Sequence, residues 1–394
     1  MDLRLTAEQE QYRRDVCALL GRDDVQAEAA SARRLPPGRE PGLLDVYRLL
    51  GERGWLAPNW PAEHGGLGRT IVEKAILTEE MIAHGVPDVV HTLAIDIVGL
   101  AVHLFGSTEM QDRLLPRLAR GEGLGCVLFS EPEVGSDLAS LTTRAEREAG
   151  GWRLYGRKVY SLKSHLADFG LCAARTTVSD VPYHGITVFA VPLDTPGVTV
   201  RPMWTMADER FGEVTLSGLL MTEADVLGEV DGGWPVVGRV LGLERTGIEF
   251  AAKGRRLLDA VLAHEDAVLA HQDTVLAHQE GPSPYAEQLV ALDAQVRAGE
   301  LLSWQALGKL AAGDYDDPLY PMAKWHSTET AKAIATITAE VCGLDAVLSA
   351  RDPDSPSGWV VESALRDAPG FTLASGTSEV MLSLIASGAL GLAP

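Results

Sequence analysis

The sequence predicts an α+β protein. A helical N-terminal region (to about residue 125) is followed by a small antiparallel β-domain (126–228) and a C-terminal helical bundle (229–394). Apolar residues recur at helical spacing in the first and last regions, whereas the middle region holds β-branched runs flanked by Gly or Pro. With 394 residues, the chain is long enough for two or three domains with buried cores.

The first region begins with a helix-start signal. Thr6 and Gln9 fit a capping box, in which each side chain bonds the other residue's backbone amide. Tyr12, Val16 and Leu19 follow at the spacing of one helix face. Further helical patterns cover the segments 43–56, 71–84, 92–105 and 109–119.

The middle region predicts short strands. The stretch Gly151–Gly156 indicates a strand approached through tight turns, and 185–192 and 197–200 are rich in Val, Ile and Thr. Such residues favour strands, and the Gly and Pro residues beside them favour turns. We therefore expect a small antiparallel barrel or sandwich over 126–228.

The last region predicts a bundle of four or five long helices, separated by loops at 281–284, 314–318 and 352–358. Three consecutive heptads occur within it: Asp259–Glu265, Asp266–Gln272 and Asp273–Gln279. Their histidines, His264, His271 and His278, would lie near one helix face but about 10.5 Å apart, too far to share one metal ion. The repeat therefore indicates an extended, partly exposed helix, or alternatively a coiled-coil seam with a partner.

The charge balance limits the classes of partner. Lys and Arg number 34 against 55 Asp and Glu, which gives a net charge of −21 at pH 7. We expect neither nucleic acid nor a membrane surface as a partner, because both would be repelled. No run of 18 apolar residues predicts a membrane span, and no secretory signal is visible. Four separated cysteines without a CxxC fit a cytoplasmic protein and argue against a disulfide framework or a zinc site.

The most informative stretch is Phe129–Asp137, which holds two serines and a glycine. It is followed by Lys158–Ser161, which ends in a tyrosine and a serine. Hydroxyl groups and glycine-permitted backbone amides at this spacing could hold a planar, phosphate-bearing cofactor between one strand and one turn.

These motifs resemble those of the acyl-CoA dehydrogenases, and the resemblance covers nearly the whole chain. Matching pieces are Leu5–Gln9, Gly54–Ala57, Leu115–Ala119, Ser130–Asp137, Asp194–Val198, Val226–Glu229, Gly376–Glu379 and Gly388–Leu392. The resemblance implies the same three-part fold, with FAD between the β-domain and the bundle and often across a dimer interface. It also implies an acyl thioester substrate on coenzyme A or a carrier protein, an electron-transfer flavoprotein as acceptor, and a homo-oligomer, dimer or tetramer.

The resemblance assigns the cofactor-binding residues of the middle region. Phe129 and Ser130 would contact the flavin ring, and Gly135 and Ser136 would lie near the pyrophosphate. In the second motif, Tyr160 stands where the family usually has Trp, and Ser161 where it usually has Thr. Both changes keep the chemical type of the side chain.

A second cofactor contact is expected at the C-terminal motif. Thr377, Ser378 and Glu379 precede an apolar-periodic helix, and a helix N-terminus offers free amides and a positive dipole end to phosphate. The same family role is implied for Thr377 and Glu379. The alternative is that Thr377 or Ser378 simply caps the helix.

The implied reaction is α,β-dehydrogenation, in which a carboxylate base removes the α-proton while the β-hydrogen leaves as hydride to FAD. One family branch has this base before the Gly-Thr pair of the C-terminal motif, where this chain has Ser375. Another branch has it on the first bundle helix, where Glu244 is our candidate and Glu249 a second one. Glu244 could instead be an ordinary helix residue paired with Arg245 or Lys253.

Further departures concern FAD. Trp304–Gly308 replaces an Arg-Phe-Gly triplet, Glu340–Leu344 replaces a Gln-x-x-Gly-Gly piece, and Met381 and Leu382 stand where Gln-Arg is frequent. Two alternatives to a flavin-dependent dehydrogenase therefore remain open. The chain could be a non-catalytic subunit that pairs with an active relative, or a flavin-dependent oxygenase on the same scaffold.

Overall fold

The computed structural model describes residues 4–36, 39–275, 284–349, 351–352, 355 and 360–392; of 243, 244 and 265–275 it describes the backbone alone. The chain forms two compact units. The bundle unit comprises Met1–Leu35, Thr78–Val86 and Arg245–Pro394. The sheet unit comprises Pro36–Leu77 and Pro87–Glu244.

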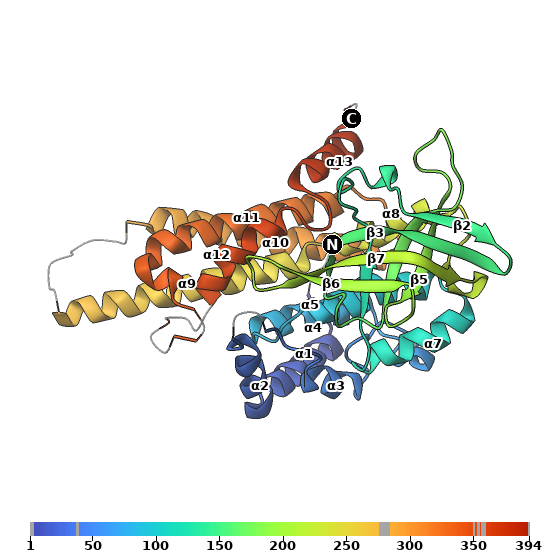
Figure 1. The fold of residues 1–394 in the computed structure, drawn as a ribbon. Coiled ribbons are helices and arrows are strands. Elements are labelled where there is room, and N and C mark those ends of the chain that lie inside the picture. Colours follow the sequence, from blue (N-terminus) through green and yellow to red (C-terminus); the bar gives the residue numbers. More distant parts are fainter. Residues whose placement is uncertain are drawn as a thin grey trace. The chain divides into compact units, whose positions relative to one another are not determined.

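Helices and strands follow the predicted order (Figure 1). The α-helices are α1 Ala7–Leu20, α2 Asp23–Arg33, α3 Asp45–Gly51, α4 Ile71–Ala83, α5 Val89–His91, α6 Leu100–Phe105, α7 Thr108–Ala119, α8 Gly233–Glu244, α9 Ile248–Val275, α10 Ala286–Ala311, α11 Leu319–Cys342, α12 Val360–Phe371 and α13 Ser378–Leu390. The strands are β1 Gly125–Leu128, β2 Arg144–Glu148, β3 Gly151–Leu162, β4 Phe169–Arg175, β5 Ile186–Pro192, β6 Val198–Trp204, β7 Arg210–Met221 and β8 Val226–Leu227.

Local sequence signals explain most element boundaries. The Thr6–Gln9 capping box starts α1, as predicted. Two predicted helices differ in detail. The 43–56 pattern forms only the helix Asp45–Gly51, and the chain turns at Gly54, which has φ +66°. The 92–105 pattern begins as a π-helix, Thr92–Gly99, before it continues as α6.

The sheet unit is built on one eight-stranded sheet. Its order is β6-β7-β3-β2-β4-β5-β8, and β1 pairs in parallel with β4. The long strands β3 and β7 form an antiparallel pair, with a register shift between Lys158 and Ser161. The apolar core of the sheet includes Trp152 and Phe189, whose ring centroids lie 5.6 Å apart in an edge-on contact.

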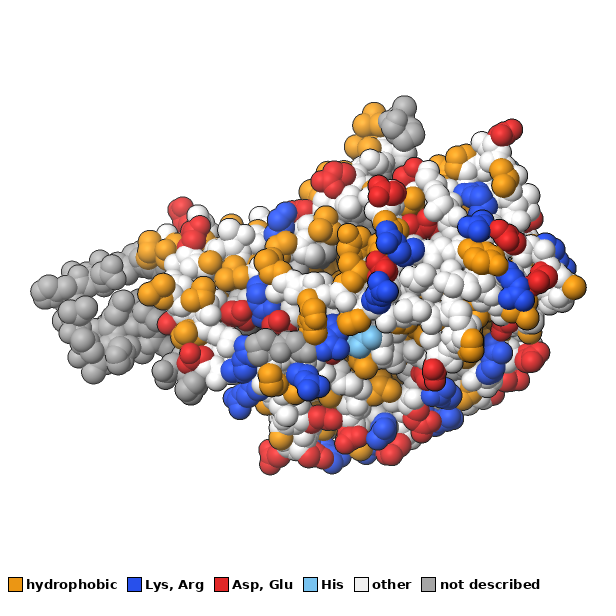
Figure 2. All heavy atoms as spheres, in the orientation of Figure 1, with side chains coloured by type: hydrophobic (Ala, Val, Ile, Leu, Met, Phe, Trp, Pro, Cys, Tyr) orange, Lys and Arg blue, Asp and Glu red, His pale blue; other side chains and the backbone are white. Residues whose placement is uncertain are grey.

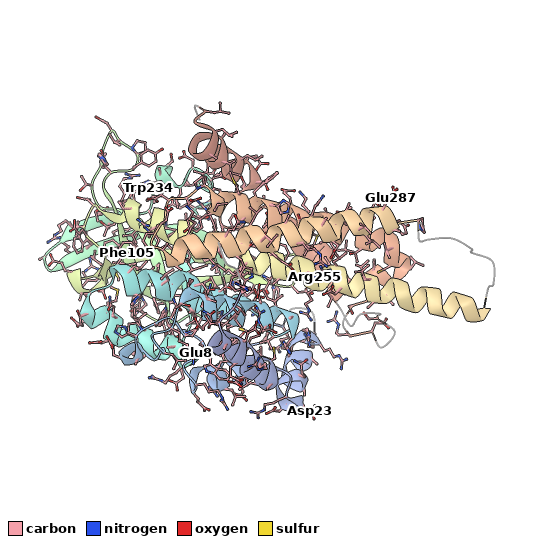
Figure 3. All side chains as sticks on the ribbon, turned by 180° about the vertical axis from the view of Figure 1, so that it is seen from behind. Glu8, Asp23, Phe105, Trp234, Arg255 and Glu287 are labelled. Atoms are coloured by element: carbon pink, nitrogen blue, oxygen red, sulfur yellow. The ribbon has the colours of Figure 1, made fainter. Side chains whose placement is uncertain are left out.

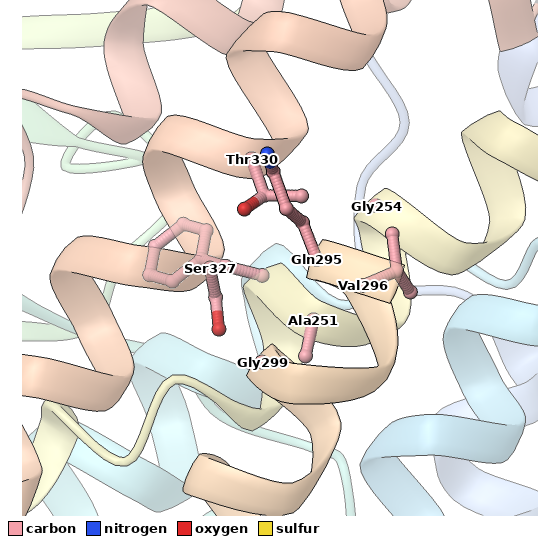
Figure 4. A pocket seen from close by; sticks show the side chains of 8 residues that line it. Ala251, Gly254, Gln295, Val296, Gly299, Ser327 and Thr330 are labelled. Carbon is pink, nitrogen blue, oxygen red and sulfur yellow. The ribbon is translucent and has the colours of Figure 1, made fainter. Parts of the chain in front are cut away.

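Helix α11 is the central helix of the bundle unit, because it packs against α9, α10, α12 and α13. Arg255 of α9, labelled in Figure 3, pairs with Asp293 of α10 at 2.6 Å and with Asp259 at 2.9 Å, and so joins two helices. A small hollow between α9, α10 and α11, too tight for a ligand, is lined by Phe250, Ala251, Gly254, Gln295, Val296, Gly299, Ser327 and Thr330 (Figure 4).

The heptad repeat begins inside α9. The helix continues to Val275, so the first two heptads and the start of the third have a helical backbone, as predicted. Side chains from residue 265, and all of 276–283, lie outside the described residues, and with them the side chains of His271 and His278.

Surface charges are mixed on the face that Figure 2 shows, where acidic and basic side chains are interspersed. Ion pairs on the sheet unit, such as Arg144–Glu146 at 2.7 Å and Arg147–Glu223 at 3.4 Å, join exposed groups of opposite sign. No helix in the described part of the chain combines the length and the apolarity needed to cross a membrane.

The break between α8 and α9 depends on Gly247. This residue has φ +77°, and a Cβ there would lie 2.8 Å from the backbone carbonyl carbon and oxygen of Ala323 in α11. We expect Gly247→Ala to lower the free energy of unfolding by more than about 1 kcal/mol, measured by urea unfolding. Gly242→Ala in α8 is the matched control, since a Cβ there meets nothing within 4 Å. It should be neutral or stabilise by up to about 1 kcal/mol; equal losses in both variants would contradict the argument.

Candidate functional site

The two motifs of the sheet unit lie against each other. The segment after β1 forms a tight turn, in which the backbone amide of Glu131 donates to Val134 O at 2.8 Å and the amide of Val134 donates back at 3.0 Å. From β3, the amide of Val159 donates to Ser130 O at 3.0 Å. The structure therefore brings Phe129 and Ser130 beside the strand that carries Tyr160 and Ser161.

A buried ion pair fixes this arrangement. Lys158 is fully buried, and its ammonium donates to Phe129 O at 3.0 Å and to Glu131 Oε1 at 2.9 Å. The other Glu131 contacts come from Thr142, through its amide (2.7 Å) and hydroxyl (2.6 Å), and from the amide of Thr143 (2.8 Å). Burial alone would raise the pKa of Glu131, but Lys158 and these donors together lower it to about 2.

Two backbone amides directly after this turn have no acceptor within the described part of the protein. Gly135 and Ser136 are exposed, and within the described residues their amides donate to no other protein group. A Cβ at Gly135 would meet nothing within 4 Å, so this backbone is open to an incoming group. Adjacent free amides without a side chain in the way are suited to an anion such as a pyrophosphate.

Tyr160 and Ser161 of β3 differ in exposure. Tyr160 has φ +55°, a left-handed conformation that is uncommon for a residue with a side chain, and its side chain is among the exposed large apolar groups. Ser161 is only 2% exposed, and its hydroxyl has no hydrogen-bond partner among the described residues. Exposed aromatic surface and an unsatisfied buried hydroxyl both fit a bound planar cofactor.

Charged residues hold the next turn of the chain. Lys163, also left-handed at φ +57°, bridges Glu40 at 2.5 Å and Glu209 at 2.6 Å. Burial lowers the pKa of Lys163, but the two carboxylates outweigh this effect and raise it. His165 contacts Glu40 as well, and burial lowers the pKa of its imidazole although Glu40 acts in the opposite direction. These contacts tie the segment around Glu40 to the end of β3.

The C-terminal motif lies in the bundle unit, where two cations hold its loop. The fully buried ammonium of Lys324 donates to Phe371 O at 3.1 Å and to Gly376 O at 2.8 Å. Arg245 Nε donates to Ser375 O at 2.8 Å. Ser375 itself has φ +57°, so the residue that replaces the carboxylate of one family branch sits in a constrained turn.

The start of α13 is capped as its sequence indicates. The hydroxyl of Thr377 accepts from the amide of Val380 at 3.3 Å, and Ser378 Oγ donates to Glu329 at 2.5 Å. Glu379 is exposed, and its own backbone amide and Thr377 lower its pKa. An ionised Glu379 would repel a phosphate, although the remaining first-turn amides favour one.

The candidate bases differ in what the structure describes of them. Glu244 is the last residue of α8, and its side chain lies outside the described residues. Glu249 lies in the first turn of α9 and is half-buried. Arg245, considered as a partner of Glu244, binds the backbone of Ser375 through its Nε.

Two of the positions that depart from the family pattern, Trp304 and Met381, have internal roles. Trp304 Nε1 donates to Glu79 at 2.9 Å, and burial raises the pKa of Glu79 to about 7. Met381 is buried, and its side chain packs against Gly376. A Cβ added at Gly376 would lie 2.7 Å from the terminal methyl group of Met381. Leu382 is exposed. Neither Trp304 nor Met381 therefore offers a charge to a phosphate.

Among the described residues, Cys17, Glu80 and His84 of the bundle unit form a group of potential metal ligands. The thiol of Cys17 donates to Glu80 Oε2 at 3.0 Å, and burial and then Glu80 raise its pKa to about 11. His84 Nδ1 lies 2.8 Å from Glu80 O. These groups satisfy one another, so we assign no metal to them.

Sequence reasoning missed the residues that position the motifs. Lys158 and Glu131 lie inside the two motifs of the sheet unit, where the sequence pattern assigned them no role, and no pattern singled out Lys324. A lysine is seldom fully buried, and a strand places alternate residues on one face. The one available signal was therefore Lys158 at an inward position of a strand.

The depressed pKa of Glu131 predicts an acid-dependent loss of stability. A shift from 4.5 to about 2 corresponds to about 3 kcal/mol in favour of the folded state at neutral pH. This contribution is complete above about pH 4.5 and disappears as the pH falls towards 2. In urea unfolding across this range, wild type should lose stability more steeply than Glu131→Gln, which has no carboxylate to protonate. Parallel pH profiles would contradict the assignment.

Comparison with known proteins agrees with the fold and the motifs. The family models described as acyl-CoA dehydrogenase N-terminal, middle and C-terminal domains match residues 6–122, 126–219 and 231–390. Acyl-CoA dehydrogenase FadE34 of Mycobacterium tuberculosis is 32% identical over 385 residues, which are 94% of this chain but 48% of that protein. FadE26 of the same organism is 29% identical over 364 residues, 90% of each chain.

Solved structures give the same result. The Tcur3481-Tcur3483 steroid ACAD has a TM-score of 0.84 at 27% identity and covers 100% of both chains. The ChsE4-ChsE5 complex from Mycobacterium tuberculosis has a TM-score of 0.84 at 28% identity, again over 100% of both chains. The predicted fold class and the predicted cofactor class are thereby confirmed. The chain belongs to the acyl-CoA dehydrogenase family, whose members use FAD to dehydrogenate acyl-CoA substrates.

Proposed function

We propose that this chain removes hydrogen from the α- and β-carbons of an acyl thioester, carried on coenzyme A or a carrier protein. FAD, when bound, supplies the two-electron acceptor for the β-hydrogen. The observation that carries the proposal is the turn after β1. It ends in the free amides of Gly135 and Ser136 and is locked to β3 by the buried Lys158. This is the polar and rigid surface that a planar, pyrophosphate-bearing cofactor needs.

The proposed roles in the sheet unit follow from exposure and free donors. Phe129 and Ser130 contact the flavin ring from the turn. The exposed ring of Tyr160 packs against it, and the unsatisfied hydroxyl of Ser161 bonds its polar edge. Gly135 and Ser136 bind the pyrophosphate.

The proposed role of the bundle unit is a second contact with FAD, at the start of α13. Thr377 orders the first turn of this helix, and Lys324 fixes the loop before it. Because Glu379 is ionised, we propose that it accepts a hydrogen bond from a hydroxyl or ring N–H group of FAD and does not contact a phosphate.

We propose Glu244 as the base that takes the α-proton. Ser375 is neutral, and its backbone is bound to Arg245, so it cannot replace a carboxylate in this role. Glu244 ends α8 directly before the turn at Gly247, and this turn fixes where α9 begins. A base at a helix end beside a constrained turn can be held at a defined position relative to a substrate.

Substitution of two neighbouring glutamates tests which residue is the base. We expect Glu244→Gln to slow reduction of bound FAD by an acyl-CoA at least about 100-fold, because the amide cannot accept the α-proton. Glu249→Gln is the matched control and should stay near the wild-type rate. The measurement is the loss of flavin absorbance in a stopped-flow instrument without oxygen. If Glu249→Gln is the slow variant, the base is Glu249; if neither is slow, the proposed mechanism is wrong.

The substrate class can be narrowed by the same assay. The similar structure named a steroid ACAD makes ring-bearing acyl-CoAs the first compounds to test beside straight chains. An electron-transfer flavoprotein is our proposed acceptor, as the sequence resemblance implies. Oxygen uptake with externally reduced flavin, in place of thioester-dependent flavin reduction, would instead support the oxygenase alternative.

A second candidate function is that of one subunit in a heteromeric dehydrogenase. Helix α13 favours an assembly, because Leu382, Leu384 and Leu390 are exposed and only Ser378 and Met381 are buried. Two similar structures are named for a pair of proteins, Tcur3481-Tcur3483 and ChsE4-ChsE5. We propose that this chain works as an oligomer, either with its own copies or with a related subunit.

The number of bound FAD molecules separates these assemblies. We expect the chain purified alone to be a homo-oligomer with close to one FAD per chain, because the turn after β1 is complete within one chain. Flavin released on denaturation gives the ratio, and light scattering gives the mass. FAD well below one half per chain that rises on co-purification with a related subunit would instead support the heteromer. A monomer with full FAD would contradict both assemblies.

A further inference from the structure

One buried side chain connects the two segments of the sheet unit to which we assign FAD. Lys158 is the last residue of β3 that pairs with β7 before the register shift, and it lies opposite Val214. Its ammonium reaches Phe129 O at 3.0 Å and Glu131 Oε1 at 2.9 Å, on the segment after β1. Both charged groups are nearly excluded from solvent, with side chains 0% and 3% exposed.

The carboxylate of this pair is saturated with donors. Beside Lys158, it accepts three bonds from Thr142 and Thr143, all at or below 2.8 Å. Glu131 also starts the turn whose reciprocal bonds with Val134 lead the chain to Gly135. A carboxylate held by donors from three directions has no freedom to turn, and neither has the backbone that carries it.

Stability alone does not explain why a charged pair stands here. Removing two charges from water is costly, and a well-packed apolar pair of similar volume is often as stable or more so. An apolar pair would fill the space around Val214 equally well but would not fix the direction of a carbonyl group. Hydrogen bonds from one ammonium to two acceptors do fix that direction.

The same residue borders the irregular part of β3. Pairing with β7 shifts between Lys158 and Ser161, and the amide of Val159 in this bulge donates to Ser130 O at 3.0 Å. The left-handed Tyr160 follows directly. Lys158 therefore stands at the joint between the bulge that turns Tyr160 outward and the turn that presents the free amides.

We infer that Lys158 and Glu131 are positioning residues, which hold the 129–136 turn and the 159–161 bulge in one fixed arrangement for FAD. The inference rests on the proposed function, since it takes FAD to be the ligand of both segments. Neither residue is assigned a direct contact with FAD. Their effect passes through the carbonyl of Phe129 and through the turn that Glu131 begins.

The test compares three variants with wild type. Lys158→Met removes the ammonium but keeps an unbranched side chain, and Glu131→Gln removes the charge but keeps the shape. Val214→Ala is the matched control. It truncates the buried residue opposite Lys158 in β7, and it lowers stability without removing either charge of the ion pair.

Two measurements follow on each apoprotein. Hydrogen exchange reports the mobility of 129–136 without any cofactor, and quenching of FAD fluorescence gives the dissociation constant. We expect both charge variants to exchange faster in this segment and to bind FAD at least about tenfold more weakly. Val214→Ala should keep the wild-type exchange in 129–136 and a dissociation constant within about twofold of the wild-type value. We expect this even if its melting temperature falls more than those of the charge variants.

Three other outcomes would contradict either this inference or the proposed function. If affinity falls in proportion to melting temperature in all three variants, the pair is merely structural and the inference is wrong. If exchange becomes faster but the affinity for FAD does not fall, the pair holds the turn but not for FAD, which also overturns the inference. If wild type binds no FAD although its 129–136 segment is protected, the proposed function fails and takes this role with it. Where Lys158→Met does not fold, Glu131→Gln gives the same comparison.

Discussion

Buried lysine ammonium groups hold the loops that we propose bind FAD. A turn or bulge leaves backbone carbonyls that no neighbouring strand or helix can reach, and each of these carbonyls needs a donor. Lys158 supplies donors for Phe129 and for Glu131 in the sheet unit, and Lys324 supplies them for Phe371 and Gly376 in the bundle unit. A single long side chain with three donors can satisfy two acceptors on a distant segment, which a shorter hydroxyl cannot do.

The way in which an acidic chain can accept an anionic cofactor follows from the same loops. With a net charge of −21, the chain has no excess of basic side chains to offer. Many of its arginines are used in pairs such as Arg255–Asp293. Free amides at Gly135 and Ser136 carry a partial positive charge without attracting a carboxylate from the protein's own surface. In the proposed site, backbone donors therefore serve where the family often has an arginine and this chain has Leu382.

The features that could be predicted from the sequence are those decided by neighbours along the chain. The Thr6–Gln9 box, the cap at Thr377 and the β-branched strands each depend on residues a few positions apart, and all are present. The bond from Lys158 to Phe129 joins residues 29 positions apart, and that from Lys324 to Gly376 spans 52. Such partners are chosen by the packing of the sheet and of the bundle, which local patterns do not encode. The left-handed turns at Tyr160 and Lys163 were missed for a related reason, because neither is a Gly or an Asn.

The burial of the lysines also affects how the protein reacts with an acyl thioester, the substrate that we propose for it. Thioesters transfer acyl groups to accessible amines, and only seven of the 34 basic residues here are lysines. Lys158, Lys163 and Lys324 are at most 4% exposed, so three of the seven amines are out of reach of an acyl donor in solution. Acylation of any of these three would therefore record an opening of the loop that its ammonium holds. The pattern of lysine acylation in the purified protein is thus a chemical record of which loops have opened.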